Sequence, residues 1–394
     1  MLEIHDFEAF RRIETPFYWY DVELLRRTLH VAAAQAQRYG VRMHYALKAN
    51  SEPRIVDAIA AAGFGAECVS GNEVQFALRH GFRPADIFFD GVCKTDPEIR
   101  EALAAGIAAF NVESLPELER LNELAREAGV TATVQLRINP DVDAGTHKYI
   151  TTGLNDNKFG ISSYSFTEVL ALLERCESVR CSGLQFHIGS QITDVQNVVR
   201  KECLKINEVV AWFEREGLAV NNIDLGGGLG IDYENPDEMP VPDFATWLRT
   251  ATETLDRGRG RTIHVEPGRS LVGQCGSLVS RVVFVKKGER KNFLILDAGM
   301  NNLIRPALYG AYHKIENLSA SYERGREEKD CAYDIVGPIC ESTDTWGENR
   351  VLRQSGRGDL VAIRSAGAYG SVMASTYNMR TPAPAVFSDE FAEK

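Results

Sequence analysis

Three residue clusters that lie far apart in the sequence each suit one part of a phosphorylated aldehyde. Lys48, in the run YALKAN, is an amine that can hold an aldehyde as a Schiff base. The glycine run 226–228, in LGGGLG, can offer backbone N–H groups to a phosphate with no Cβ in the way. Glu266, in EPGRS, can keep a pyridine nitrogen protonated. No cluster is decisive alone, but together they indicate pyridoxal phosphate as the cofactor.

Each of these features also has a simpler interpretation. A lysine at the end of a strand is more often a solvent-facing residue, and Glu266 could instead form an ion pair with Arg269. A lone glycine-rich turn is a weak signal, and this one fits neither the Walker nor the dinucleotide spacing. His187 could equally be a rim residue or an imidazole that stacks on the cofactor ring. Ser190, in HIGSQ, could add a hydroxyl hydrogen bond to the phosphate.

The elements that must position these residues alternate between strand and helix patterns. Helical patterns occur for instance at 53–62, 97–106, 115–129 and 195–217. Such alternation predicts a parallel sheet with right-handed crossovers, and eight units predict a closed (β/α)8 barrel of the α/β class. The eight strand candidates are 43–48, 65–70, 86–90, 108–114, 132–139, 179–189, 221–228 and 262–268.

The polar residues fall at the ends of these predicted strands. Lys48 ends the first strand, His187 and Ser190 the sixth, the glycine run the seventh and Glu266 the eighth. Enzymes built on such barrels place their chemistry at the C-terminal ends of the strands, often with a phosphate site after the seventh. The sequence therefore predicts one active site at this rim.

After about residue 270 the pattern changes to strands with few helices between them. The stretches 277–299, 331–340 and 358–370 predict a separate β domain, a sandwich or barrel, which the early strand at 15–21 could join. We therefore expect a cofactor-binding barrel at 26–268 and a C-terminal β domain at 269–394 that contributes substrate and interface residues. Residues 1–25 would pair with the β domain.

The bulk composition disfavours several other classes of protein. The chain of 394 residues has 55 acidic and 44 basic residues and a net charge of −11, with no basic stripe that would suit nucleic acid. The N-terminus lacks the apolar core of a signal peptide, and no apolar run approaches a membrane span. The eight cysteines include no CxxC pair, so we expect reduced thiols, a cytoplasmic protein and no metal site.

The motifs of the chain resemble those of the diaminopimelate decarboxylases, pyridoxal phosphate enzymes of the alanine-racemase-like fold type. The ornithine and arginine decarboxylases of that class are related. The RPALY stretch favours the diaminopimelate branch over the ornithine branch. The resemblance runs essentially end to end through TPFYWYD, YALKAN, HIGSQ, LGGGLGIDY, EPGRSLV, AGMNNLIRPALYGAYH, CESTDTW and AGAYGSVMASTYN.

The resemblance implies a role for each residue of the cofactor site. Lys48 is the Schiff-base lysine, His187 stacks on the ring and Glu266 faces the pyridine nitrogen. The phosphate end is held by a hydroxyl, a glycine turn and a phenol. The expected phosphate residues are Ser190, Gly226, Gly227, Gly228 and Tyr369, and the EPGRS motif adds Pro267, Gly268 and Arg269 to the cofactor site.

The resemblance also implies the reaction, the loss of carbon dioxide from meso-2,6-diaminopimelate to give L-lysine. The carboxylate of the non-reacting centre would be gripped by Arg269, Arg305 and Tyr309, with Tyr369 nearby. Two further residues come from one motif: Glu341 would pair with the distal amine and Cys340 would donate the proton. In the family these two cross from the partner subunit, which implies a homodimer with shared sites.

Two departures from the family pattern and two alternatives accompany this interpretation. Glu67 and Trp19 differ from what relatives usually carry, and neither is expected to touch a motif position. The protein could decarboxylate another diamino acid of the D-lysine, ornithine or carboxynorspermidine type, which Arg305 and Tyr309 argue against. It could also be a regulatory pseudoenzyme that binds pyridoxal phosphate, but such a protein should have lost Lys48 or Cys340.

Overall fold

The computed structural model describes residues 4–139, 158–187, 189–258, 260–323 and 329–391. The chain forms two compact units. The barrel unit comprises Leu29–Gly230 and Asp243–Gly268, and the β unit comprises Met1–Thr28, Ile231–Pro242 and Arg269–Lys394. The predicted barrel at 26–268 includes residues 231–242. This segment belongs to the β unit, where its Tyr233 and Asp237 bind Arg269 and Arg364.

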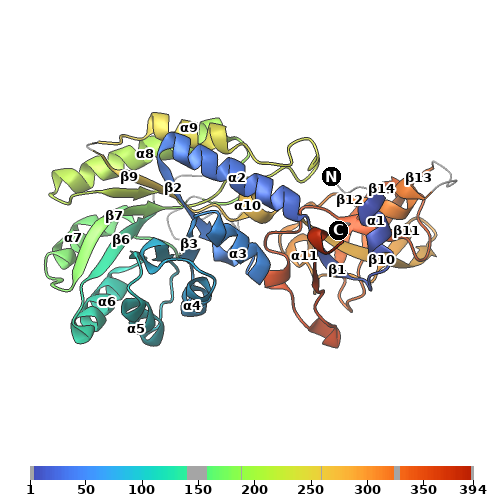
Figure 1. The fold of residues 1–394 in the computed structure, drawn as a ribbon, viewed down its shortest axis with the longest axis horizontal. Coiled ribbons are helices and arrows are strands. Elements are labelled where there is room, and N and C mark those ends of the chain that lie inside the picture. The colour runs from blue at the N-terminus through green and yellow to red at the C-terminus, as the bar shows by residue number, and fades with distance from the viewer. Residues whose placement is uncertain (1–3, 140–157, 188, 259, 324–328, 392–394) are drawn as a thin grey trace. The chain divides into compact units, whose positions relative to one another are not determined.

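Eight parallel strands close the barrel unit, as Figure 1 shows. Each strand pairs with the next, and the last returns to the first through Val41 opposite Ile263. The predicted (β/α)8 barrel is therefore confirmed. Its strands are β2 (Val41–Ala46), β3 (Gly65–Cys68), β4 (Ile87–Phe89), β5 (Ala109–Val112), β6 (Ala132–Ile138), β7 (Val179–Phe186), β8 (Asn222–Asp224) and β9 (Thr262–Val265).

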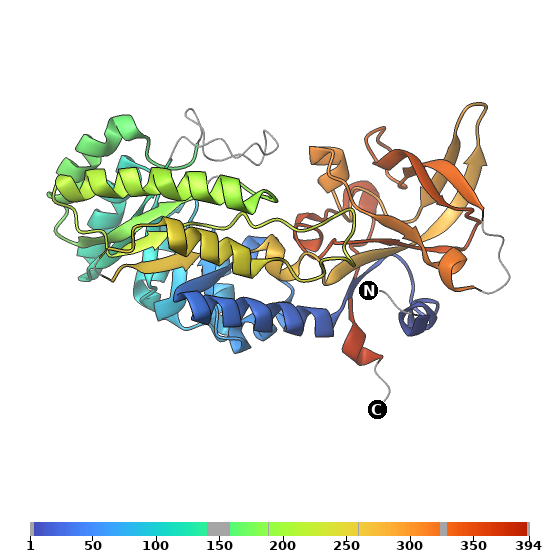
Figure 2. The same ribbon diagram turned by 90° about the horizontal axis from the view of Figure 1, so that it is seen from above.

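Amphipathic helices lie around these strands, as Figures 1 and 2 show. In α6 (Leu115–Ala128) the Ser114 hydroxyl accepts the Glu117 N–H, while Gly129 ends the helix in the left-handed conformation. No helix in the described ranges is long and apolar enough to cross a membrane. The other α-helices that accompany the barrel strands in the described ranges are α2 (Val22–Tyr39), α3 (Pro53–Ala61), α4 (Gly71–Arg79), α5 (Asp96–Ala105), α7 (Phe166–Leu173), α8 (Val195–Arg215) and α9 (Phe244–Thr254).

The β unit is organised around one long strand, β10 (Gly276–Lys287). Its first half pairs with β1 (Phe17–Tyr20) and β15 (Leu360–Ile363), and its second half pairs with β11 (Asn292–Leu296). A register shift between Val282 and Phe284 separates the two halves. The remaining strands are β12 (Ile315–Asn317), β13 (Asp330–Val336), β14 (Thr345–Arg353) and β16 (Ala385–Phe387).

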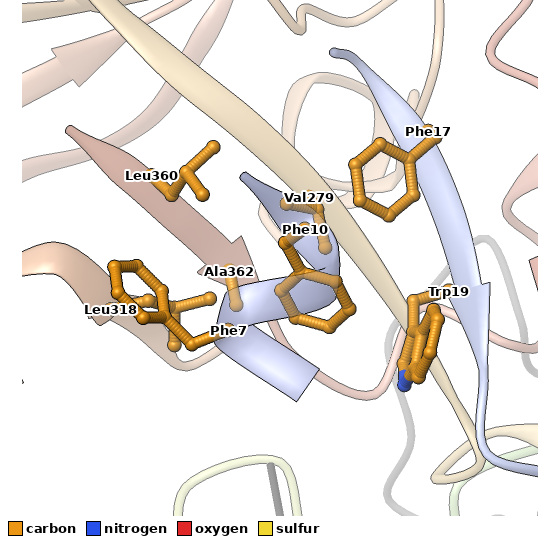
Figure 3. Close-up of a cluster of buried hydrophobic side chains, with 8 residues drawn as sticks. All are labelled: Phe7, Phe10, Phe17, Trp19, Val279, Leu318, Leu360 and Ala362. Atoms are coloured by element: carbon orange, nitrogen blue, oxygen red, sulfur yellow. The ribbon is translucent and has the colours of Figure 1, made fainter. Parts of the chain in front are cut away.

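An aromatic cluster fills one core of the β unit (Figure 3). Helix α1 (Ile4–Phe10) brings Phe7 and Phe10 to it, and Phe10 meets Trp19 edge to face at a centroid distance of 4.7 Å. Trp19, one of the two departures from the family pattern, is therefore a packing residue. The cluster consists of Phe7, Phe10, Phe17, Trp19, Val279, Leu318, Leu360 and Ala362.

Two buried histidines meet inside the barrel unit. The rings of His44 and His264 are joined through Nε2 and Nδ1 at 2.9 Å, and His44 Nδ1 lies 3.1 Å from the carbonyl oxygen of Asp86. Burial lowers the pKa of His44 from its ordinary value of 6.5 to about 4. Burial, together with His44, also lowers the pKa of His264. Both rings are therefore neutral in the folded protein at neutral pH.

This pair predicts a loss of stability on acidification. Between about pH 6.5 and pH 4 the unfolded chain binds more protons than the folded one, so the free energy of unfolding falls as the pH is lowered. His44 alone would contribute about 3 kcal/mol. Urea unfolding across this range should show a shallower pH dependence for His44→Leu than for wild type. The exposed control His30→Leu should keep the wild-type slope. Equal slopes in wild type and His44→Leu would contradict the assignment.

Candidate active site

Lys48 lies just beyond the first barrel strand rather than within it. It sits in a 3-10 turn, η1 (Leu47–Ala49), which follows the end of β2 at Ala46 and in which the Asn50 N–H donates to the Leu47 carbonyl. The Ala46 N–H donates to the Pro267 carbonyl at 3.3 Å. The Lys48 amine donates to both carboxylate oxygens of Glu67, at 2.6 and 2.5 Å. The expectation that Glu67 touches no motif position was therefore wrong, since this residue is the ion-pair partner of the predicted cofactor lysine.

The Glu67 carboxyl group is suited to exchanging a proton with Lys48. Its side chain is fully buried at the end of β3. Burial, opposed by Lys48 and assisted by the negative charge of Asp90, raises its pKa to about 7. A carboxylate with this pKa can take the proton of the Lys48 ammonium group, and the resulting neutral amine is a nucleophile.

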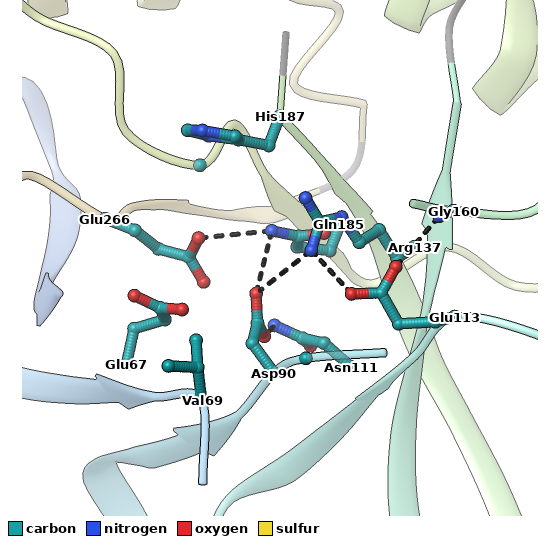
Figure 4. Close-up of polar contacts among 12 residues, drawn as sticks. Glu67, Val69, Asp90, Asn111, Glu113, Arg137, Gly160, Gln185, His187 and Glu266 are labelled. Carbon is teal, nitrogen blue, oxygen red and sulfur yellow. Dashed lines mark hydrogen bonds and ion pairs between the residues drawn. The ribbon is translucent and has the colours of Figure 1, made fainter. Parts of the chain in front are cut away.

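Glu266 follows β9 and keeps one oxygen without a protein partner. Its Oε2 accepts from the side-chain amide of Gln185 at 3.1 Å, and the same amide lies 3.3 Å from Asp90 Oδ2 (Figure 4). Its Oε1 is buried and has no hydrogen-bond partner within the described ranges. A buried acceptor of this kind requires a donor. The protonated nitrogen of a pyridine ring would supply one, so this residue fits the predicted cofactor.

The surroundings of Glu266 favour a positively charged ligand group. Oxygens of Glu67, Asp90 and Glu266 lie within 4.8 Å of one another. Burial and the nearby carboxylates, above all Asp224, raise the pKa of Glu266. A cationic ring beside it would favour the ionised form and so lower that pKa. Lys48 already supplies a positive charge to this cluster, which disfavours a metal ion there.

An arginine from the middle of the barrel completes the buried network. Arg137, on β6, contacts Glu113 at 2.6 Å and lies 3.9 Å from Asp90 (Figure 4). The other Glu113 oxygen accepts the Gly160 backbone N–H at 2.8 Å. Sequence reasoning missed Arg137, Asp90 and Gln185. A signal existed only for Gln185, which precedes His187 by two positions and so faces the same side of its strand.

The glycine turn after β8 has no room for side chains. Gly226 has φ +68°, and a Cβ there would lie 2.5 Å from the Phe186 carbonyl oxygen, while a Cβ on Gly227 would lie 2.4 Å from that of Glu266. The Gly226 N–H donates to Asp224 at 2.8 Å and the Gly227 N–H to His187 at 3.2 Å. Within the described ranges only the Gly228 N–H of this run lacks a protein acceptor. Phosphate binding by the run stays a prediction, supported most directly at Gly228.

His187 is held in one orientation by this turn. Its Nδ1 accepts the Gly227 N–H, and burial together with the positive charges of Arg137 and Lys48 lowers its pKa. The ring is therefore neutral, with its proton on Nε2. Ser190 lies in the segment that follows, whose Ile192 N–H donates to the Gly228 carbonyl at 2.8 Å. The barrel unit thus brings together His187, the glycine run and the segment that carries Ser190.

The β unit brings the two predicted carboxylate-binding arginines to one tyrosine, Tyr233, that sequence reasoning did not assign. Arg269 Nη1 donates to the Tyr233 hydroxyl at 2.6 Å and lies 4.8 Å from the centre of the Tyr369 ring. Arg305 lies 5.0 Å from the centre of the Tyr233 ring. Arg305 begins α11 (Arg305–Tyr309) and Tyr309 ends it. Both arginines are 6% exposed, so their charges are largely removed from water.

Cys340 and Glu341 are exposed, unlike the other predicted site residues of the β unit. They lie between β13 and β14, where the Cys340 N–H donates to Asn378 Oδ1 at 2.9 Å. Glu341 accepts a short hydrogen bond from the Tyr377 hydroxyl. Within the β unit this loop is therefore tied to the segment around Tyr377 and not to the buried arginines.

Known proteins are similar in sequence to this chain over nearly its whole length. A family profile described as "Pyridoxal-dependent decarboxylase, pyridoxal binding domain" matches residues 23–273. The diaminopimelate decarboxylase of Bacteroides thetaiotaomicron is 48% identical over 391 residues, which cover 99% of this chain and 100% of that protein. The diaminopimelate decarboxylase of Neisseria meningitidis serogroup B is 43% identical over 378 residues, 95% of this chain and 88% of that protein.

Solved structures give the same result for the fold. Diaminopimelate decarboxylase from Helicobacter pylori, complexed with L-lysine, superposes with a TM-score of 0.89 at 36% identity and covers 97% of this chain and 94% of its own. The lysine/ornithine decarboxylase from Vibrio vulnificus, complexed with putrescine, gives 0.80 at 25% identity, with 98% of each chain covered. This chain belongs to the diaminopimelate decarboxylase family of pyridoxal-dependent decarboxylases, as its motifs predicted.

Proposed function

We propose that this protein removes carbon dioxide from meso-2,6-diaminopimelate and releases L-lysine, the last step of lysine biosynthesis. Family membership makes pyridoxal phosphate the cofactor, which when bound withdraws electrons from the reacting carbon. Lys48 would hold its aldehyde carbon, and Glu266 Oε1 would accept the pyridine N–H. His187 would stack on the ring. The phosphate would be held by Ser190, Gly226, Gly227, Gly228 and Tyr369, with Pro267, Gly268 and Arg269 beside them.

The environment of Arg305 is the observation that supports meso-diaminopimelate as the substrate. Its side chain is buried, and no carboxylate within the described ranges lies at ion-pair distance from it. A buried arginine without an anionic partner is costly unless a ligand supplies one. Arg269, whose guanidinium group lies 5.9 Å from the centre of the same Tyr233 ring, would assist, as would Tyr309 at the end of α11. We assign the distal carboxylate of the substrate to this set. An amino acid without that carboxylate would leave Arg305 unpaired.

The first test concerns this carboxylate. Arg305→Ala should lower kcat/KM for meso-diaminopimelate by at least about tenfold, because a buried charge-assisted hydrogen bond is lost. The absorbance of the bound cofactor should hardly change. As a control, Arg261→Ala removes an arginine of the barrel unit whose side chain is 8% exposed and paired with Glu214. It should keep kcat/KM within about twofold. An unchanged kcat/KM in Arg305→Ala would contradict the assignment.

We infer a homodimer in which Cys340 and Glu341 serve the active site of the other subunit. Both residues are exposed in the single chain, and next to them Tyr377 and Met379 leave 45% and 97% of their surfaces exposed. Exposed apolar residues around chemically active ones favour an interface. Cys340 would then donate the proton to the reacting carbon and Glu341 would bind the distal amine.

Subunit mixing tests this arrangement. Lys48→Ala and Cys340→Ala homodimers should each be inactive, and hybrid dimers should recover part of the activity because one of their two sites is intact. Subunit exchange is verified with differently tagged chains, and wild type diluted with Lys48→Ala provides the matched control. Verified exchange with no recovered activity would contradict shared sites.

The state of the cysteines supports a compartment. The eight cysteines are all unpaired, which supports a reducing compartment and hence the cytoplasm.

Decarboxylation of a different diamino acid is the second candidate function, since a lysine/ornithine decarboxylase shares the fold. Arg305 is buried, and none of the described carboxylates lies at ion-pair distance from it, which favours the dicarboxylate substrate over such amino acids.

A further inference from the structure

A buried histidine of the β unit is bonded directly to Arg305. His313 is 2% exposed, and its Nε2 lies 2.8 Å from Arg305 Nη1. An arginine has donors only, so Nε2 must be the acceptor and cannot carry a proton. The ring also meets Tyr233 edge to face, at a centroid distance of 5.0 Å. His313 therefore contacts both the guanidinium group and the aromatic ring beneath it.

The other nitrogen of His313 fixes the protonation state that this bond requires. Its Nδ1 lies 2.8 Å from the backbone carbonyl of Arg364, so Nδ1 carries the proton and donates it. Burial, reinforced by the charge of Arg305, lowers the pKa of His313 to about 3. The ring is thus neutral throughout the working range of an enzyme, with its lone pair directed at Arg305.

The carbonyl that orients His313 is itself held firmly. Arg364 follows β15, and its N–H donates to the Lys314 carbonyl at 2.8 Å beside the β12–β15 pairing. Its guanidinium group binds Glu316 at 2.6 Å and Asp237 at 2.8 Å. Chain movement at this point would break two ion pairs. The direction of the His313 ring is therefore set by the sheet.

Arg305 and Arg364, which are linked through His313, have different kinds of partner. Arg364 is neutralised by two carboxylates. Arg305 is oriented by an imidazole lone pair and an aromatic face, both neutral, and by no carboxylate within the described ranges. A neutral acceptor fixes the direction of a guanidinium group without cancelling its charge. The full charge of Arg305 thus stays available for an anionic ligand.

We propose that His313 is a positioning residue for substrate selection: it fixes the guanidinium group of Arg305 while leaving its charge for the distal carboxylate. This inference rests on the proposed function, because it assumes that Arg305 binds that carboxylate. It adds a residue that touches neither cofactor nor substrate. Replacing His313 should therefore change KM and the affinity for dicarboxylates far more than kcat.

Two substitutions separate the two bonds of His313. In His313→Gln the side-chain amide can reach the position of Nε2 and keep an acceptor for Arg305. In His313→Asn the amide matches Nδ1, so it keeps the bond to Arg364 and loses the one to Arg305. His313→Leu is a second variant without an acceptor for Arg305. The test therefore does not depend on the folding of His313→Asn alone. His44→Leu is the matched control, since His44 is 4% exposed and also bonded to a backbone carbonyl.

The measurements are kcat and KM for meso-diaminopimelate and the inhibition constant of pimelate, the dicarboxylate of equal chain length without amino groups. All use cofactor-loaded enzyme with a verified thermal transition. His313→Asn and His313→Leu should raise KM and the inhibition constant about tenfold, with kcat within about threefold of wild type. His313→Gln should stay within about threefold for both constants. His44→Leu should leave both constants unchanged, whatever its stability.

Two outcomes would overturn the inference in distinguishable ways. Arg305→Ala could weaken the binding of pimelate while the acceptor-free His313 variants bind it like wild type. In that case His313 does not position Arg305, and the proposed function stands. If His313→Gln is impaired as much as His313→Asn, the residue acts through packing alone. A wild-type enzyme that neither binds pimelate nor decarboxylates meso-diaminopimelate would contradict the proposed function itself.

Discussion

Replacing Lys48 by alanine is expected to lower kcat by at least about 1000-fold, since the amine that we propose holds the cofactor is removed. The substitution also leaves Glu67 fully buried without its ion-pair partner. That carboxyl group should then bind a proton at neutral pH, because nothing offsets the cost of its burial. The variant should fold, bind the cofactor only reversibly and lose the absorbance of the covalently bound form.

Peptide mapping identifies the lysine directly. Borohydride reduction of the wild-type enzyme should leave the pyridoxyl group on Lys48. Lys94 is the internal comparison, because its side chain is 1% exposed and its amine donates to Gly91, Asn111 and Glu117. An amine engaged in this way serves the structure and should carry no adduct. An adduct on Lys94, or on any lysine other than Lys48, would contradict the site.

Replacing Glu266 by glutamine is expected to lower kcat by about 100-fold or more, comparable to the loss of one preorganised transition-state contact. A glutamine cannot keep the pyridine nitrogen protonated, so the ring withdraws fewer electrons from the reacting carbon. The stability of the cofactor-free protein should not fall. Burial and three nearby carboxylates already raise the pKa of Glu266, and the amide removes that repulsion. Lost activity without lost stability distinguishes a chemical role from a structural one.

Glu202 provides the matched control for this substitution. It lies on α8 of the same unit, is 4% exposed like Glu266, and burial raises its pKa to about 8. It is therefore mostly protonated at neutral pH, and glutamine is a close substitute. Steady-state kinetics of Glu202→Gln should stay within about twofold of wild type. A Glu266→Gln enzyme that is as active as Glu202→Gln would exclude Glu266 from the cofactor site.

The sequence predicted the barrel and its rim because both follow from local patterns. Alternating strands and helices specify a parallel sheet, and the C-terminal ends of parallel strands meet at one edge. Glu266 and the turn at Gly226 could be assigned to that edge from their positions alone. Lys48 was assigned to the strand itself and lies in the turn after it. The strand ends early because residues 47–49 form a 3-10 turn, in which the Asn50 N–H donates to the Leu47 carbonyl.

The residues that sequence reasoning missed depend on partners far along the chain. Glu67 is 19 positions from Lys48, and its contact with that lysine follows from strand pairing in the barrel. Tyr233 stands in the LGGGLGIDY motif, but its role follows from the departure of 231–242 from the barrel unit. His313 stands in the RPALYGAYH motif and acquires its role through the Arg364 carbonyl. Helix and strand periodicity carries no information about such pairings.

The most direct test of the account is the reaction itself, measured with cofactor-loaded wild type. Equal concentrations of meso-diaminopimelate, L-lysine and L-ornithine are supplied separately, and carbon dioxide release and the chirality of the amino acid product are determined. We expect carbon dioxide and L-lysine from meso-diaminopimelate, with kcat/KM at least about 100-fold above that for either single-carboxylate amino acid. Faster release of carbon dioxide from L-lysine or L-ornithine than from meso-diaminopimelate would contradict the proposed substrate and the role of Arg305.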